Sequence, residues 1–246
     1  MTSAVWGRRG TLSVVDLVGA AAQNNADWCA VVCAAHGLRS TFDTDAWVSE
    51  RRSPPMYPDA VTLVPEVAGD GLLTRIEAGP GCSVKDSYAD LDLRSAGFEV
   101  LFEANWICRT ADVAGVPTGI DWAAVTTAAQ LAEWAAAHGG GDVFTSRLLD
   151  DPAVTVLAGQ KAGAIVAGVV VNVSTAAHWT AQVVGVSNLF AVRGEDDGDV
   201  WAGATAAVTA LHPGVLVVGY ESGPSLAAAE WVGFERVGAL RVWYAP

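Results

Sequence analysis

Residues 183–199 combine two features with opposite chemical implications. An apolar segment, VVGVSNLFAV, runs into a loop with glycines at 194 and 198 and then into an alanine-rich segment. A glycine-containing loop at the start of a helix presents backbone amides that can bind a phosphate group. The loop itself reads RGEDDGD, and its four carboxylates would repel such an anion. The stretch therefore raises the question of whether it holds a phosphate-bearing cofactor.

Five residues nearby or in matching segments carry groups suited to hydrogen bonding or proton transfer. Ser187 and Asn188 lie inside the apolar segment, where a polar group is costly unless it has a partner. Tyr220 and Glu221 end the segment VLVVGYE, and Glu103 lies within FEVLFEANW. Each residue also has a purely structural interpretation. These are an internal hydrogen bond for the first two, aromatic packing for the tyrosine, a helix cap for Glu221 and a solvated strand position for Glu103.

The elements that must position these residues are clearest in the C-terminal half. Asp121 can cap a helix that the glycines at 139–141 end, and Asp199 can cap a second helix. Pro224 suits the first turn of a third helix, which Gly233 would end. Strands are predicted at 155–160, 164–174, 183–192, 215–221 and 235–244. This order predicts a mixed α/β fold.

The N-terminal half is less regular but contains a suspected repeat of the C-terminal pattern. A helix is expected over 27–36 and a strand over 60–67. Residues 72–106 and 216–244 each read as a strand, an acidic residue, a Gly-Pro turn, a helix, a Gly-Phe pair and a tryptophan-bearing strand. We therefore expect two pseudo-repeated lobes, 1–110 and 111–246. Gly-Phe after a helix is also a general capping device, so the repeat is one of two interpretations.

The C-terminal order of elements resembles the GNAT acyltransferase superfamily over about residues 100–246, with a degenerate N-terminal copy. The resemblance implies a mixed central sheet flanked by helices, in which the strand at 183–192 splays from the strand at 215–220. Acetyl-coenzyme A would lie in the resulting gap. The residues implied to line its pantetheine arm and pyrophosphate are Leu189, Phe190, Ala191, Val192, Arg193, Gly194 and Gly198.

The same resemblance gives the polar residues candidate catalytic roles. Acyl transfer to an amine needs a base, a stabilised oxyanion and an acid for the thiolate. Glu221 or Glu103 would be the base, and Ser187 and Asn188 would lie beside the acyl group. Two departures from the family pattern stand out. The loop glycines lack the family's Gly-x-Gly or Gly-x-Ala spacing, and Ala229 stands where a tyrosine acid is common, so Tyr220 would have to replace it.

Composition narrows the class of partner. The formal net charge is −13 and no basic run offsets it, which argues against nucleic acids and anionic membranes and favours a cationic or amine substrate. The four cysteines form no CxxC pair and the histidines do not cluster, so we expect no metal site and a reducing, cytoplasmic location. No hydrolase, Walker or dinucleotide-binding motif occurs.

Two functional hypotheses follow. The first is an N-acyltransferase that transfers an acetyl or other acyl group from coenzyme A to a small amine. The alternative is a catalytically inactive GNAT-like fold that serves as a ligand-binding or protein-interaction module. The acidic loop and Ala229 favour the second, whereas the strand-loop-helix order and Glu221 favour the first.

Overall fold

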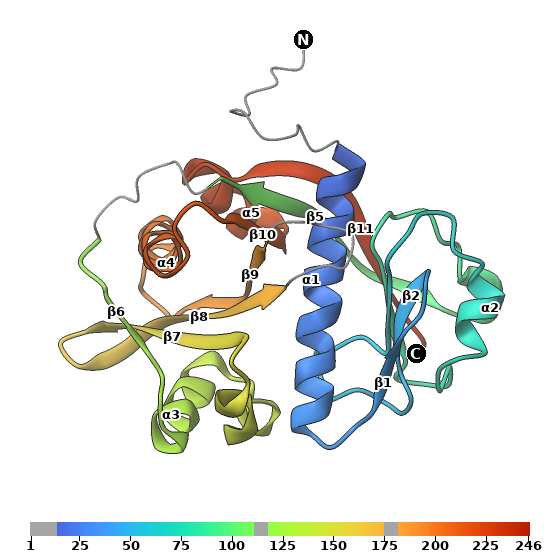
Figure 1. Ribbon diagram of the computed structural model, residues 1–246, viewed down its shortest axis with the longest axis horizontal. Coiled ribbons are helices and arrows are strands. Elements are labelled where there is room, and N and C mark those ends of the chain that lie inside the picture. Colours follow the sequence, from blue (N-terminus) through green and yellow to red (C-terminus); the bar gives the residue numbers. More distant parts are fainter. Residues whose placement is uncertain (1–13, 111–117, 175–181) are drawn as a thin grey trace, which may run out of the picture.

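The computed structural model describes residues 14–110, 118–174 and 182–246 (Figure 1). It is a mixed α/β fold, as predicted. The helices are α1 (Val14–Ala35), α2 (Gly69–Leu73), α3 (Ala128–His138), α4 (Asp197–Leu211) and α5 (Gly223–Trp231). The strands are β1 (Ser40–Phe42), β2 (Ala46–Ser49), β3 (Ala60–Thr62), β4 (Ser83–Asp86), β5 (Glu99–Arg109), β6 (Asp121–Ala124), β7 (Val154–Lys161), β8 (Ala164–Ser174), β9 (Val183–Ala191), β10 (Leu216–Glu221) and β11 (Glu235–Tyr244).

All these strands form one sheet in the order β1-β2-β3-β4-β11-β5-β10-β9-β8-β7-β6. Only the pairs β3–β4 and β9–β10 are parallel within the described ladders. The long strands β5 and β11 are antiparallel to each other and join the two halves of the sheet (Figure 1). Strand β5 therefore lies between β10 and β11, and β11 separates it from β4, its neighbour in sequence. The predicted boundary at residue 110 stays a prediction.

Helices cover both faces of the sheet. Helix α1 lies across the middle of one face (Figure 1) and packs its N-terminal half on β5, β10 and β11. Its C-terminal half packs with α3, through Trp28 and Trp134, in a second cluster. Helices α4 and α5 cover the other face, where Trp201 and Phe234 pack against β7, β8, β9 and β10. Strand β9 thus lies between α1 on one face and α4 on the other.

The helix that was predicted to start at Asp121 starts instead at Ala128. Residues 121–124 form β6, which pairs with β7 at the sheet edge. Thr127 caps α3 through a capping box with Gln130, and this signal outweighs the isolated aspartate upstream. The prediction that Asp199 caps α4 is also wrong, because Asp196 is the capping residue and accepts from the Asp199 amide at 3.1 Å.

The N-terminal half departs further from its predicted elements. The helix expected at 27–36 is the C-terminal part of the longer α1, and the strand expected at the start of the repeat is α2 followed by turns. The Gly-Phe pairs do end helical segments as predicted. Gly97 and Gly233 have φ of 84° and 94°, which favour glycine, and the phenylalanines that follow them are buried.

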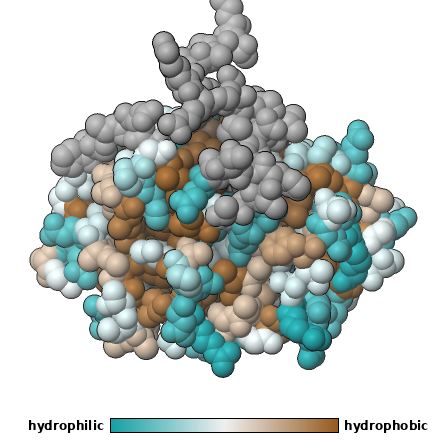
Figure 2. Space-filling model, in the orientation of Figure 1, coloured by the Kyte–Doolittle hydropathy of each residue, from teal (hydrophilic) through white to brown (hydrophobic). Residues whose placement is uncertain are grey.

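The surface is mixed in polarity. Figure 2 shows apolar side chains gathered over the middle of the face seen in Figure 1, with hydrophilic ones along its right and lower edges. Among the helices that the structure describes, none is both long and apolar enough to cross a membrane. The four cysteines are buried free thiols.

Candidate functional site

Strands β9 and β10 are neighbours over only part of their length. The ladder between them ends at Val218 opposite Gly185. Beyond this point β9 stays paired with β8, and β10 stays paired with β5. The facing edges over 186–191 and 219–221 form no ladder with each other, so the two strands part as the resemblance to the GNAT superfamily implied. Backbone groups along these edges are available to a bound ligand.

A β-bulge accompanies the parting of the strands. Ser187 lies opposite Val170 and Phe190 lies opposite Gly168, so two residues of β9 face one residue of β8. Asn188 has a φ of 52°, a left-handed conformation that asparagine tolerates better than most residues. Its Oδ1 accepts hydrogen bonds from the indole of Trp28 at 3.1 Å and the hydroxyl of Tyr57 at 3.2 Å. These contacts fix the bulge of β9 against α1 and the proline-rich turn.

A cavity of about 200 Å³ lies where the strands part. Four of the predicted catalytic residues line it, namely Ser187, Asn188, Tyr220 and Glu221. The Ser187 hydroxyl is buried and has no hydrogen-bond partner in the described part of the chain. An unpartnered buried hydroxyl is costly, which suggests that a ligand completes its bonding.

Glu221 lies at the end of β10 and carries the most useful acid–base group in the cavity. Burial, with a smaller contribution from the charge of Asp197, raises the pKa of its carboxyl group to about 7. A hydrogen bond from the Ser222 amide acts in the opposite direction. Near neutral pH the carboxyl group can therefore both accept and donate a proton.

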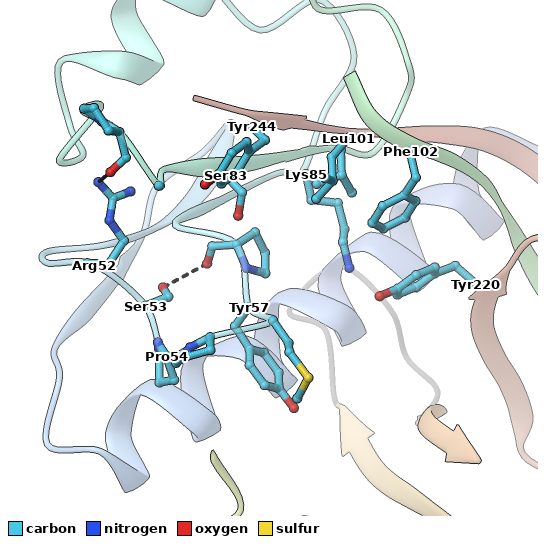
Figure 3. Close-up of a pocket in the computed structure, with 16 residues that line it drawn as sticks. Arg52, Ser53, Pro54, Tyr57, Ser83, Lys85, Leu101, Phe102, Tyr220 and Tyr244 are labelled. Carbon is cyan, nitrogen blue, oxygen red and sulfur yellow. Dashed lines mark hydrogen bonds between the residues drawn. The ribbon is translucent and has the colours of Figure 1, made fainter. Parts of the chain in front are cut away.

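A larger cavity of about 570 Å³ adjoins the first (Figure 3). The two share the lining residues Met56, Tyr57, Pro58, Lys85 and Tyr220. Exposed apolar side chains surround its opening, including Met56, Leu101, Phe102 and Tyr244. In Figure 3, Lys85, Tyr57 and Tyr220 lie around one common space.

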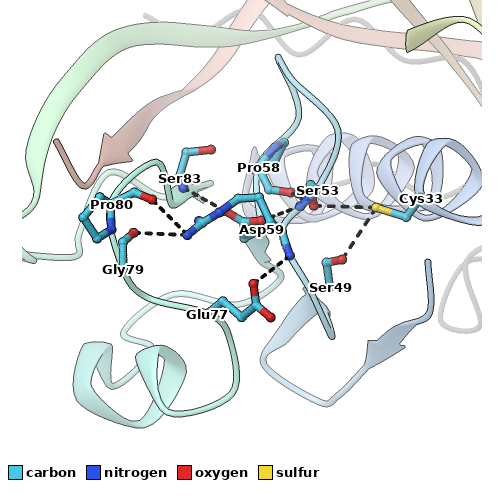
Figure 4. Close-up of polar contacts among 10 residues, drawn as sticks. Cys33, Ser49, Ser53, Pro58, Asp59, Glu77, Gly79, Pro80 and Ser83 are labelled. Carbon is cyan, nitrogen blue, oxygen red and sulfur yellow. Dashed lines mark hydrogen bonds and ion pairs between the residues drawn. The ribbon is translucent and has the colours of Figure 1, made fainter. Parts of the chain in front are cut away.

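A polar network fixes the proline-rich wall of this larger cavity (Figure 4). The buried carboxylate of Asp59 accepts from the guanidinium of Arg52 at 2.8 Å and from the amides of Ser53 at 2.7 Å and Ser83 at 3.0 Å. Arg52 also donates to the carbonyls of Gly79 and Pro80. Because Asp59 is fully bonded, it contributes to shaping the wall without competing for a ligand.

The loop before α4 divides its negative charge between two positions. Glu195 forms an ion pair with Lys161 of β7, whereas the carboxylate of Asp196 stays at the helix start, where it accepts from the Asp199 amide. Within the described residues, no acceptor bonds the amides of Asp197 and Gly198, the first two of the helix. A side chain at Gly198 would meet Asp196 and the ring of Trp231, a tryptophan of α5 that is 66% exposed. The helix start thus keeps two free amides beside two acidic side chains.

Comparisons with known proteins identify the fold. No family model and no curated protein matches the sequence. A GCN5-related N-acetyltransferase from Kribbella flavida superposes with a TM-score of 0.61 at 16% identity, over 92% of this chain and 95% of that one. The chain has the GNAT fold. A protein from Novosphingobium aromaticivorans assigned to the GNAT acetyltransferases gives 0.56 at 15% identity, over 92% and 99%. A conserved protein of unknown function from Staphylococcus epidermidis gives 0.59 at 11%, over 83% and 92%.

The GNAT fold brings most of the predicted cofactor residues to one edge but separates their side chains. Leu189 lines the smaller cavity, whereas the ring of Phe190 packs on Trp134 and His138 in the core. Ala191 and Val192 continue the pairing with β8. Any contact of the last three with a pantetheine arm would therefore come from the backbone.

The acidic loop offers an anion its backbone amides and the exposed side chain of Arg193. Arg193 and Gly194 form the turn, with Gly194 at a φ of 102°, and Gly198 leaves the helix start open. Free amides and the absent side chain fit the pyrophosphate of an acyl-coenzyme A, and the open edge of β9 fits its arm. Asp196 and Asp197 weaken this fit by repulsion, which direct measurement can quantify.

Glu103 does not line either cavity. It lies on β5, where its exposed carboxylate pairs with Arg241 at 2.8 Å. Glu103 was named as a candidate base, but its position on β5 is solvent-exposed. Glu103 is therefore a solvated strand residue, which was the structural interpretation of its position in the sequence.

Several lining residues escaped the sequence analysis, namely Asn25, Trp28, Tyr57 and Lys85. They come from α1, the proline-rich turn and β4, which lie far from β9 in sequence. The one signal that could have found Lys85 is its rarity, because it is one of two lysines in the chain and follows a strand valine. The other three carry no motif that distinguishes them from core residues.

Proposed function

We propose that this protein is an N-acyltransferase that transfers an acyl group, such as acetyl, from coenzyme A to a small amine. The observation that carries the proposal is the opening between β9 and β10 with the half-buried Glu221 at its edge. When bound, the acyl-coenzyme A supplies the acyl group as an activated thioester. Its arm would lie along β9, from Leu189 to Val192, with its pyrophosphate near Gly194 and Gly198.

The chain's own groups would act at the point where the two strands part. The unpaired backbone edge of β9 offers amides to the acyl carbonyl, a form of electrostatic stabilisation that is strong in a buried site. Glu221 would accept the proton of the attacking amine, directly or through water, because its pKa of about 7 suits this transfer. Ser187 and Tyr220 place hydroxyl groups in the same cavity as candidate donors to the departing sulfur.

Asn188 takes a different part in this proposal. Its side-chain oxygen accepts hydrogen bonds from Trp28 and Tyr57, so Asn188 is a positioning residue. By fixing the bulge, it would keep the edge of β9 turned toward the acyl group. This role replaces the direct contact with substrate that its sequence position suggested.

The proposal favours direct attack by the amine over an acyl-cysteine route. Cys29 is the one cysteine that lines the smaller cavity. Burial raises the pKa of its thiol to about 12, so the thiol stays protonated and weakly nucleophilic at neutral pH. We also retain a cytoplasmic location as part of the proposal, since four free thiols suit a reducing compartment.

Acetyl-coenzyme A binding and turnover test this proposal together. At millimolar concentration, acetyl-coenzyme A should raise the melting temperature by mass action, and a panel of small amines should release free coenzyme A thiol. Binding without turnover on any amine would support the inactive, ligand-binding alternative. If acetyl-coenzyme A causes no temperature shift and no thiol is released, coenzyme A is rejected as a ligand.

A further inference from the structure

Lys85 is a buried lysine whose ammonium group faces the space shared by the two cavities. Its side chain projects from β4, and the residue is 3% exposed. Its Nζ donates to Asn25 Oδ1 at 2.8 Å and lies 3.9 Å from the centre of the Tyr220 ring. A lysine has three donor hydrogens, so these contacts leave bonding capacity for a ligand.

No anion of the described chain neutralises this ammonium group. Lys85 takes part in no ion pair within residues 14–110, 118–174 and 182–246. Burial raises the pKa of its neighbour Cys29 to about 12 and holds that of Tyr57 well above its ordinary value, so both stay neutral. A buried charge normally has a partner of opposite sign, which indicates that a ligand supplies it.

The lining of the cavities differs from the whole chain in its charge balance. The protein has 27 acidic and 14 basic residues. Among the described residues that line the two cavities, Glu221 is the one acid and Lys85 and Arg52 are the bases, but the carboxylate of Asp59 pairs with Arg52 at 2.8 Å. Lys85 is therefore the cation of this lining that has no carboxylate partner among the described residues, and it favours an anionic group on the acceptor.

We propose that the acceptor is an amine that also carries a carboxylate, as in an apolar α-amino acid, and that Lys85 binds this carboxylate. The inference rests on the proposed function. Lys85 and Glu221 lie in the lining of the same 200 Å³ cavity, so one small zwitterion can place its carboxylate at the first and its amine at the second. The apolar residues around the adjoining cavity, such as Leu101 and Phe102, would receive its side chain.

The test compares matched acceptors that differ only in the carboxylate. The twenty standard amino acids, their amides and the corresponding decarboxylated amines are assayed for acetyl-coenzyme A-dependent thiol release. The wild type should prefer at least one acid over its amide by about a hundredfold in kcat/KM. The amine of an amide loses its proton more easily, so proton availability would favour the opposite order.

Variants at Lys85 assign this preference to the residue. Lys85→Met should lower kcat/KM for the acid about a hundredfold and change that for the amide only a few-fold, because it removes the cation at similar volume. Lys85→Arg keeps the charge and should retain part of the preference. Arg39→Met, which removes an exposed surface cation, is the matched control and should leave all rates unchanged. Melting curves establish that each variant is folded.

The possible outcomes separate the two proposals. Equal use of acids and amides, or an unchanged acid preference in Lys85→Met, would overturn the assignment while leaving acyl transfer intact. If no amine is acetylated, the proposed function fails, and binding of free amino acids is then measured by thermal shift. An amino acid that stabilises the wild type but not Lys85→Met would still support a carboxylate site, and absence of such a shift would overturn it.

Discussion

The two ends of the opening between β9 and β10 differ in the charged groups that they present to a bound ligand. At the α4 end, two free backbone amides face a loop in which Asp196 and Asp197 are exposed. At the α1 end, one buried lysine lies in a lining whose single acid is Glu221. The contrast shows that the charge which a binding surface attracts depends on which of its charged or polar groups are buried and without a partner. The net charge of −13 describes neither end.

The largest expected effect comes from removing the acid–base group that separates these ends. Glu221→Gln should lower kcat/KM about a hundredfold or more, because the amide cannot accept a proton. In the wild type, kcat/KM should rise with pH through about 7 as the carboxyl group ionises, and the variant should lose this rise. Affinity for acetyl-coenzyme A, measured by titration, should stay within a few-fold. Unchanged turnover would remove Glu221 from the mechanism.

The same residue predicts a pH dependence of stability. Its pKa in the folded protein, about 7, lies above the ordinary value of 4.5, so the folded state binds the proton more tightly than the unfolded state does. This contribution to the free energy of unfolding is complete below pH 4.5 and is lost as the pH rises through about 7. Denaturant unfolding at several pH values should show the decline in the wild type and a flatter profile in Glu221→Gln.

A smaller effect, on the free energy of unfolding, is expected from substitution of Asn188 in the bulge between the two ends. Asn188→Ala should lower the free energy of unfolding by about 2–3 kcal/mol, since alanine is strained at positive φ and two buried donors lose their acceptor. Asn188→Gly relieves the strain and should cost less. Equal losses in the two variants would show that the backbone conformation contributes nothing, and the difference is measured by urea denaturation.

The acidic loop allows a test of the α4 end alone. Asp197→Asn should tighten acetyl-coenzyme A binding by up to about fivefold through lost repulsion, and it should also lower the pKa of Glu221. Asp196→Asn retains a good helix cap and reports repulsion without loss of stability. Asp70→Asn, an exposed change in α2, is the control. Unchanged affinity in both loop variants would mean that their carboxylates point to solvent.

The smallest effect should follow from Glu103→Gln. Its exposed ion pair with Arg241 is worth little, and the residue lines neither cavity. Turnover should therefore remain within about twofold of the wild type, a difference close to the precision of such assays. A loss comparable to that of Glu221→Gln would show that the site has been placed on the wrong strands.

Local sequence signals predicted the C-terminal half well and the acceptor side poorly. Strands β7 to β11 and the caps at Gly97 and Gly233 follow from short apolar runs and glycine chemistry, which act within a few residues. Helix α3 was extended too far because Asp121 resembles a cap, although Thr127 and Gln130 form the stronger one. Lys85 meets Asn25 and Tyr220 only through tertiary packing, and no spacing in the sequence reports such a meeting.

The position of strand β5 in the sheet constrains the order in which the chain can fold during synthesis. Its two partners in the sheet, β10 and β11, are the last two strands of the chain. During synthesis β5 emerges from the ribosome long before either of them, and so it must wait with both edges bare. A ribosome paused after β5 has left the exit tunnel, but before β10 and β11 have been made, would therefore hold a chain prone to aggregation, and completion of the chain should remove this tendency.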